Sequence, residues 1–227
     1  LVGDKRLVAA AGHNLAIAYA NRGDLAKADE LYRESLALER ELGNKADVAA
    51  TLYQLGNLAY GRGELAKAEE LYKQSLALAQ ALSHEAGTAR LMHQLGMLAQ
   101  DRGELAKAEG LYQESLALER ELGDKGGIAS TLHQLGKLAY DRGELEKAEG
   151  LYQESLGLKR ELGNKSGIAG TLHQLGILAY DSGDLKEAER LYQESLALAR
   201  ALGAKSGLAL SLHQLGLLRE QQERLQD

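Results

Sequence analysis

Residues 132–156 read LHQLGKLAYDRGELEKAEGLYQESL, and this stretch recurs with small changes every 40 residues along the 227-residue chain. Its first segment has five copies, which begin at Leu52, Met92, Leu132, Leu172 and Leu212. The repeats are close copies, since residues 103–142 and 143–182 differ at only eight positions. A fixed period of about 20–50 residues is typical of a solenoid, in which each unit buries its apolar face against its neighbours. We therefore expect function on a surface rather than in an enclosed pocket.

The composition is that of a folded protein, with 44% hydrophobic and 26% charged residues. No apolar run approaches the roughly 20 residues that a membrane-spanning helix needs, and residues 1–10 lack the apolar core of a signal peptide. The formal net charge is −6, and acidic and basic residues are interspersed without a basic stripe for phosphate binding. We expect a cytoplasmic protein with neither a membrane nor a nucleic acid as partner. Cysteine is absent, which excludes disulfides.

Each unit carries the pattern of two helices. Residues 104–122 place apolar or small side chains near a period of 3.6, with charges on the opposite side, which predicts an amphipathic helix of about five turns. Gly123 stands where a left-handed C-terminal cap belongs, and Asp124 can cap a second helix over about 125–141. Because the connections are only about two to four residues long, the paired helices should be antiparallel neighbours.

A glycine recurs inside the second of these helices, where it costs up to about 1 kcal/mol relative to alanine. The glycines are Gly56, Gly96, Gly136, Gly176 and Gly216. Such a cost requires a compensating gain, and we expect close approach of the partner helix. A recurring tyrosine of that partner helix should fill the space beside the glycine, at Tyr72, Tyr112, Tyr152 and Tyr192.

The pattern LxxLGxxAYxxGxLxxAxxLYxxSL resembles the tetratricopeptide repeat. The match includes Leu132, Leu135, Gly136, Gly143, Leu145, Ala148, Tyr152, Ser155 and Leu156, and it recurs across essentially the whole chain. There are two departures: Leu132 stands where the family usually has tryptophan, and the period is 40 where the common form has about 34. The resemblance implies an all-α, right-handed superhelical solenoid of antiparallel helix pairs.

The repeats predict a single array over residues 1–227, with about five full helix-pair repeats and a C-terminal half repeat. Residues 2–5 align with residues 42–45, which lie at the junction between two repeats. We therefore expect a fragment of a longer protein.

The first helix of each tetratricopeptide repeat, which here contains the LHQLG segment, lines a concave groove in that family. The resemblance therefore implies a peptide-binding groove formed by Tyr53, Gln54, Asn57, Tyr60, Arg90, His93, Gln94, Met97, His133, Gln134, Lys137, Tyr140, His173, Gln174, Ile177 and Tyr180. In related long-repeat adaptors, amides at the glutamine position hold the main chain of an extended peptide, since an amide both donates and accepts. The alternative is that these glutamines bridge adjacent helices within the array.

Histidine recurs at one groove position, which invites a metal-site interpretation. Equivalent helices are about 10 Å apart, too far for two such rings to share one zinc ion, and no HxxxH or CxxC spacing is present. We expect no metal and no cofactor. A tyrosine seven residues further along the same helix face, such as Tyr140 or Tyr180, would form a ring-lined wall with the histidine. Histidines in that wall would make ligand binding sensitive to pH near 6.5.

Motifs of catalysis are absent: the chain has no phosphate loop of the GxxxxGK type, no HExxH and no nucleophile elbow. Ser115 and its equivalents lie on the apolar side of a helix, where packing is the expected role. We predict a protein-interaction scaffold of the signalling-adaptor kind that binds a protein or peptide in its groove, and no enzyme. The alternative is a structural or regulatory arm that self-associates through the array ends or packs on an absent effector domain.

Overall fold

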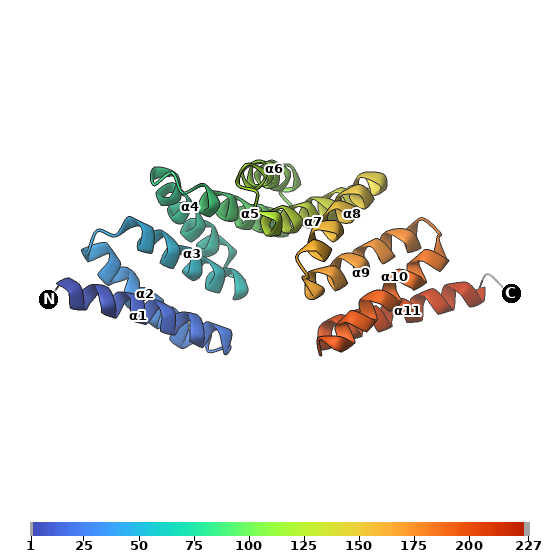
Figure 1. Ribbon diagram of the computed structural model, residues 1–227, viewed down its shortest axis with the longest axis horizontal. Helices are drawn as coiled ribbons and strands as arrows, with labels where there is room; N and C mark the ends of the chain where they lie inside the picture. The colour runs from blue at the N-terminus through green and yellow to red at the C-terminus, as the bar shows by residue number, and fades with distance from the viewer. Residues whose placement is uncertain (1, 225–227) are drawn as a thin grey trace. The chain divides into compact units, whose positions relative to one another are not determined.

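The computed structural model describes residues 2–224, and within this range every element of regular structure is an α-helix (Figure 1). The helices are α1 (Val2–Asn21), α2 (Leu25–Glu41), α3 (Lys45–Gly61), α4 (Leu65–Ala81), α5 (Glu85–Asp101), α6 (Leu105–Leu122), α7 (Lys125–Asp141), α8 (Leu145–Glu161), α9 (Lys165–Asp181), α10 (Leu185–Ala201) and α11 (Lys205–Arg224). The helix predicted over 125–141 is α7, and the helix predicted over 104–122 is α6, which begins one residue later. No helix of the described part is long and apolar enough to cross a membrane.

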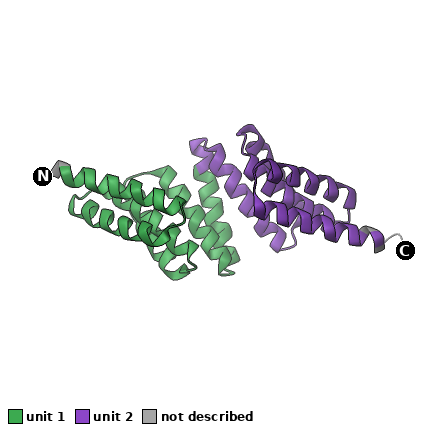
Figure 2. Cartoon of the chain, turned by 90° about the horizontal axis from the view of Figure 1, so that it is seen from below, with its two compact units in different colours: residues 1–118 green, residues 119–227 purple. Residues whose placement is uncertain are grey.

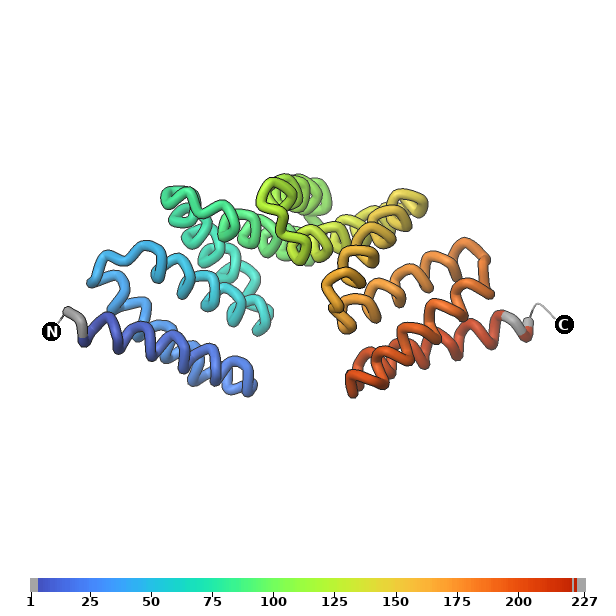
Figure 3. Tube along the Cα trace, viewed as in Figure 1, coloured from blue at the N-terminus to red at the C-terminus, as the bar shows by residue number. Residues whose placement is uncertain are grey.

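The chain forms two compact units, residues 1–118 and residues 119–227, with the boundary inside α6 (Figure 2). In the first unit α1 packs on α2, α3 packs on α4, and each pair is joined to the next through contacts of α2 with α3 and of α4 with α5. The second unit repeats this plan with α7 on α8 and α9 on α10, followed by α11. Figure 3 shows the chain reversing direction at each turn. The prediction of an all-α solenoid of antiparallel helix pairs is confirmed.

The turns between helices depend on one residue with left-handed backbone geometry. Gly123 has φ of +67°, as its predicted capping role requires. The side chain of Asp124 then accepts hydrogen bonds from the backbone N–H groups of Gly126 and Gly127 at the start of α7. Ser83 replaces glycine at one junction and still adopts φ of +51°, so α5 begins at Glu85 with the usual register.

Each recurring tyrosine is buried against the glycine of its partner helix, as predicted. Tyr72 is fully buried, and a Cβ atom added to Gly56 would lie 2.6 Å from Cδ1 of the Tyr72 ring. Real Cβ atoms essentially never approach that closely, so only glycine fits there. Gly216 differs, because nothing lies within 4 Å of its added Cβ. The close approach thus requires a partner helix that carries the tyrosine.

The recurring serine joins the two helices of a pair through a buried hydrogen bond. Ser75 Oγ donates to the carbonyl oxygen of Ala49 at 2.7 Å, and Ser155 Oγ donates to that of Ala129 at 2.6 Å. The same bond joins Ser115 to Ala89 and Ser195 to Ala169. The serine side chain is therefore part of the helix packing, as expected, and its hydroxyl satisfies a buried backbone carbonyl.

Candidate functional site

All sixteen predicted groove residues lie on odd-numbered helices, and none of them is fully buried. In the first unit they come from α3 and α5, and in the second unit from α7 and α9. Arg90 and Lys137 are exposed, and the other fourteen are half-buried. We call the surface that these side chains form in each unit the odd-helix face. Their exposure leaves them accessible to a ligand.

Two contacts connect the odd-helix face of α3 with that of α5. The Arg90 guanidinium lies 6.0 Å from the centroid of the Tyr53 ring, at the outer limit of a cation–π contact. The Tyr60 hydroxyl donates a hydrogen bond to the carboxylate of Asp101 on α5. In the second unit, Tyr140 on α7 makes the same bond to Asp181 on α9 at 2.6 Å. Tyrosines of the predicted groove therefore also hold neighbouring odd helices together.

The amide groups of the predicted groove divide into two kinds. In α3, Asn57 Nδ2 donates to Gln54 Oε1 at 3.2 Å, and Asn57 Oδ1 accepts from the Tyr72 hydroxyl at 2.8 Å. These amides are engaged inside the protein. The glutamines equivalent to Gln54 in the later repeats are Gln94, Gln134 and Gln174. Their side chains make no hydrogen bond to another described residue. Three half-exposed amides are thus available to a ligand.

Each histidine of the odd-helix face makes a tilted ring contact with a buried tyrosine of the partner helix, whereas the wall with Tyr140 or Tyr180 stays a prediction. The ring centroids are 5.3 Å apart for His133 and Tyr152. His93 with Tyr112 and His173 with Tyr192 repeat the contact at 5.5 and 5.7 Å. The contact forms because the recurring tyrosine lies against the helix glycine, three residues from the histidine. Within the described residues, no cluster of three or more His, Cys, Asp or Glu side chains could hold a metal ion.

Burial keeps these histidines neutral at physiological pH. Desolvation lowers the pKa of His93 to about 4. The pKa of His133 is lowered to about 3 by desolvation and by the positive charges of Lys159 and Lys137. Burial also lowers the pKa of His173. The expected response to pH near 6.5 is therefore wrong for His93 and His133, and the pKa of His173 moves in the same direction.

The odd-helix face contains a pocket in each unit, which sequence analysis did not anticipate. The pocket of the first unit has a volume of about 410 Å³ and includes Tyr53, Gln54 and Arg90 of the predicted groove. The pocket of the second unit has a volume of about 290 Å³ and is lined by groove residues that include His133, His173 and Gln174. Ala79 in the first pocket and Ala199 in the second occupy equivalent positions. The sequence indicates these two pockets only by alanine at this position, where the other repeats have Glu or Lys.

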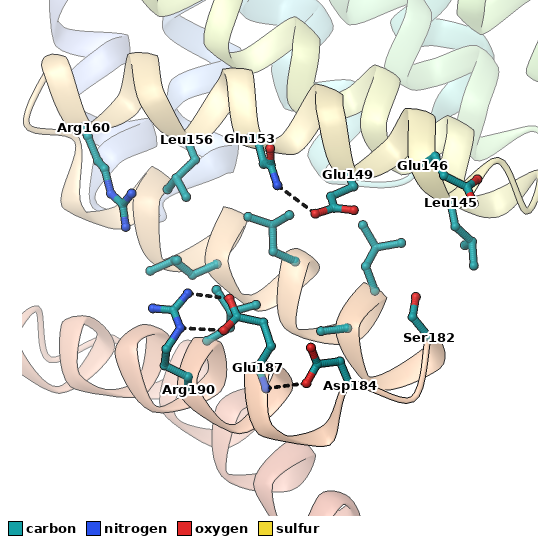
Figure 4. A pocket seen from close by; sticks show the side chains of 15 residues that line it. Leu145, Glu146, Glu149, Gln153, Leu156, Arg160, Ser182, Asp184, Glu187 and Arg190 are labelled. Carbon is teal, nitrogen blue, oxygen red and sulfur yellow. Dashed lines mark hydrogen bonds and ion pairs between the residues drawn. The ribbon is translucent and has the colours of Figure 1, made fainter.

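A third pocket, of about 410 Å³, lies between α8, α9 and α10 (Figure 4). It contains none of the predicted groove residues. Its charged rim is largely paired within the protein: Arg190 binds Glu187 at 2.6 Å, Gln153 donates to Glu149 at 2.8 Å, and Arg160 pairs with a glutamate of α10. Because these groups already have partners, this pocket offers less polar recognition than the odd-helix face.

The sequence profile of the tetratricopeptide repeat matches residues 7–81, 87–161 and 167–227. A search of curated proteins found no match.

Solved structures share the fold. BtubC (BKLC) from P. vanneervenii superposes with a TM-score of 0.73 and 21% identity, over 89% of this chain and 91% of that one. Aspartyl phosphate phosphatase F from Bacillus subtilis superposes with a TM-score of 0.83 and 10% identity, over 98% of this chain and 59% of that one. The Rap conjugation gene regulator of the plasmid pLS20, in complex with the Phr* peptide, superposes with a TM-score of 0.80 and 17% identity, over 92% of this chain and 58% of that one. At these identities the likeness shows the fold alone.

Proposed function

Because the chain belongs to the tetratricopeptide repeat family, we propose that it is a protein-interaction scaffold whose odd-helix face binds an extended peptide. Binding rather than catalysis is proposed because the sequence has no catalytic motif and the recurring serine hydroxyl is used in helix packing. A solved protein of the same fold carries a bound peptide, which supports this class of ligand.

The observation that carries the proposal is the set of available amides. Gln94 on α5, and Gln134 and Gln174 on α7 and α9, occupy the same repeat position and have no hydrogen-bond partner among the described residues. A primary amide can donate to a peptide carbonyl and accept from a peptide N–H at the same time. In the second unit α7 and α9 are in contact, so Gln134 and Gln174 present two such groups on neighbouring helices, and Gln94 presents one in the first unit. Amides that hold a main chain are indifferent to side-chain identity.

The test is to replace Gln94, Gln134 and Gln174 together by alanine and to measure binding of peptides selected from a random display library on the native protein. Loss of two to three hydrogen bonds of about 0.5–1.5 kcal/mol each should weaken binding at least about fivefold. The matched control is a second triple variant at exposed glutamines of even-numbered helices, Gln74, Gln153 and Gln193, whose amides donate to a glutamate four residues earlier.

The control variant should bind as the native protein does, and both variants should keep the native helical content by circular dichroism. Equal affinity of the native protein and the Gln94, Gln134 and Gln174 variant would refute main-chain recognition by the glutamines. Failure to select any peptide would count against a peptide groove altogether.

A second candidate function is association through the end of the array, and α11 favours it. Leu212 is 52% exposed, whereas its equivalent Leu172 is fully buried. Leu210 and Leu217 on the same helix are 54% and 38% exposed. Leu210 and Leu217 are seven residues apart and so share one side of α11, and exposed apolar residues on one side of a helix are typical of an interaction surface. Sedimentation of the native protein and of a variant with these three leucines changed to serine or glutamine tests it, since self-association predicts a larger mass for the native protein only.

A further inference from the structure

One position on the even-numbered helices varies between repeats although it is buried in all of them. We call it the plug position, and it is occupied by Glu39, Ala79, Glu119, Lys159 and Ala199. A buried position in an array of near-identical repeats should be among the most uniform, because its neighbours are the same each time. Here it carries a negative charge, a positive charge or only a methyl group. The variation therefore needs an explanation beyond core packing.

Where the plug residue is long, its side chain reaches an odd helix and fills the space there. Glu39 Oε1 accepts a hydrogen bond of 3.0 Å from the Thr51 hydroxyl, and Lys159 Nζ donates one of 2.8 Å to the Thr171 hydroxyl. A Cβ atom added to Gly167 would lie 3.0 Å from Cδ of Lys159. The plug side chain thus runs past the first turn of the next odd helix and ends at a threonine.

Where the plug residue is alanine, the same space is open. Ala79, Gly87 and Leu91 line the pocket of the first unit, and they are the equivalents of Lys159, Gly167 and Thr171. In the second unit the residues at these three positions are Ala199, Gly207 and Ser211, and they line its pocket. Each pocket of the odd-helix face therefore includes the space that a long plug side chain occupies in other repeats.

The pocket of the first unit combines apolar side chains with the guanidinium of Arg90. Ala49, Leu82 and Leu91 contribute apolar surface. Arg90 lies in the lining, is exposed, and forms no ion pair with another described residue, while its guanidinium lies over the Tyr53 ring. An apolar cavity with an unpaired guanidinium beside it is complementary to an apolar group that carries a carboxylate close by.

We propose that the pocket beside Ala79 receives a large apolar side chain of a bound peptide, that Arg90 pairs with an acidic residue next to that side chain, and that the plug residue decides which repeats can accept such an anchor. This inference rests on the proposed peptide-binding function and adds side-chain selectivity to it. Main-chain binding by glutamines is indifferent to sequence, whereas the pocket selects a peptide with an apolar residue flanked by acids.

The first test uses fluorescein-labelled peptides of sequence GSGSEXESGSG, in which X is Leu, Met, Phe or Ser. The native protein should bind the three apolar peptides about tenfold more tightly than the Ser peptide. The double variant A79E/L91T, which copies the Glu39 and Thr51 pair, should lose that preference. The variant A79M places a long side chain in the plug space without burying a charge, and it should lose the preference as well. R90Q should weaken binding of the glutamate-flanked peptides and leave a glutamine-flanked series unchanged.

The matched control is A199E/S211T, which closes the equivalent pocket of the second unit and should leave the preference intact. An unchanged preference in both A79E/L91T and A79M, with native circular dichroism spectra, would overturn the inference. If the Gln94, Gln134 and Gln174 variant still loses affinity for all peptides in that case, the proposed function stands without the pocket.

The second test needs no peptide and uses N-acetyl-leucine, which joins a leucine side chain to a carboxylate. The alanine methyl groups of the protein are labelled with ¹³C. In the native protein N-acetyl-leucine should shift the NMR signals of Ala49 and Ala79, whereas in A79M it should leave the signal of Ala49 unshifted. Shifts at these methyls together with no binding of any peptide would support the pocket and refute the peptide groove. No shift and no peptide preference would overturn the inference.

Discussion

Lys159 Nζ donates a hydrogen bond of 2.8 Å to the Thr171 hydroxyl, at the repeat position where Glu39 accepts one from Thr51. A threonine hydroxyl can bind either the carboxylate or the ammonium group, because it can donate its proton or accept through a lone pair. In the first unit Thr51 Oγ1 also lies 2.8 Å from Nδ1 of His13. Since Thr51 donates its only proton to Glu39, the proton of the second bond must come from His13. The threonine thus allows the plug residue to change charge without a change of fold.

Lys159 should make stability rise with pH in the alkaline range. Burial lowers its pKa to about 8, below the ordinary lysine value of 10.5, so the unfolded chain binds more protons between pH 8 and 10.5. Stability conferred by the neutral form is present above pH 10.5 and is lost as the pH falls through 8. K159M should therefore be more stable than the native protein at pH 7, by about 1–3 kcal/mol, and the difference should shrink toward pH 10. Urea unfolding at both pH values measures it, and an equal difference at each would contradict it.

Glu39 should have the opposite dependence on pH. Burial raises its pKa above the value of 4.5 expected in the unfolded chain, and the hydrogen bond from Thr51 opposes the shift only in part. The protonated form is therefore favoured in the folded state, and the stability it confers is lost as the pH rises above 4.5. E39Q should be more stable than the native protein at pH 7 and similar to it near pH 4. The exposed substitution E41Q is the control and should be nearly neutral at both.

Gly136 should tolerate no side chain. A Cβ atom there would lie 2.8 Å from Cδ1 of the buried Tyr152 ring, so G136A should lower the free energy of unfolding by about 1–3 kcal/mol through overpacking. G157A and G216A are matched controls inside helices, since nothing lies within 4 Å of an added Cβ at either position. Both should be more stable than the native protein, by up to about 1 kcal/mol, through better helix propensity. Thermal unfolding followed by circular dichroism distinguishes the three.

His133 should remain neutral down to strongly acidic pH. Its pKa is lowered to about 3, so the unfolded chain binds one more proton between about pH 3 and 6.5. The folded state loses stability as the pH falls through this window. In an NMR titration the His133 ring signals should not shift between pH 7.5 and 5. H133Q should show a weaker loss of stability between pH 7 and 5 than the native protein, and an identical loss would contradict the burial argument.

Several features of the fold follow from local sequence alone. The bounds of α7 and the left-handed geometry of Gly123 could be predicted because periodicity, capping residues and turn residues act within a few positions of the chain. The pairing of Gly136 with Tyr152 could also be predicted, since the 40-residue repeat and short turns leave only one antiparallel arrangement. The sixteen groove residues do lie on accessible positions of odd helices, although which of them contact a ligand remains a prediction.

The helices, their antiparallel pairing and the family thus follow from the sequence, because each depends on repeated short-range patterns. The three-dimensional fold is needed to find the neighbours of each histidine, the glutamines whose amides stay available, and the pockets beside Ala79 and Ala199. Each of these depends on how far a side chain extends from one helix toward another. Lys159 and Ala79 occupy the same repeat position, yet one fills a cavity and the other leaves it open, and only packing in three dimensions reveals that difference.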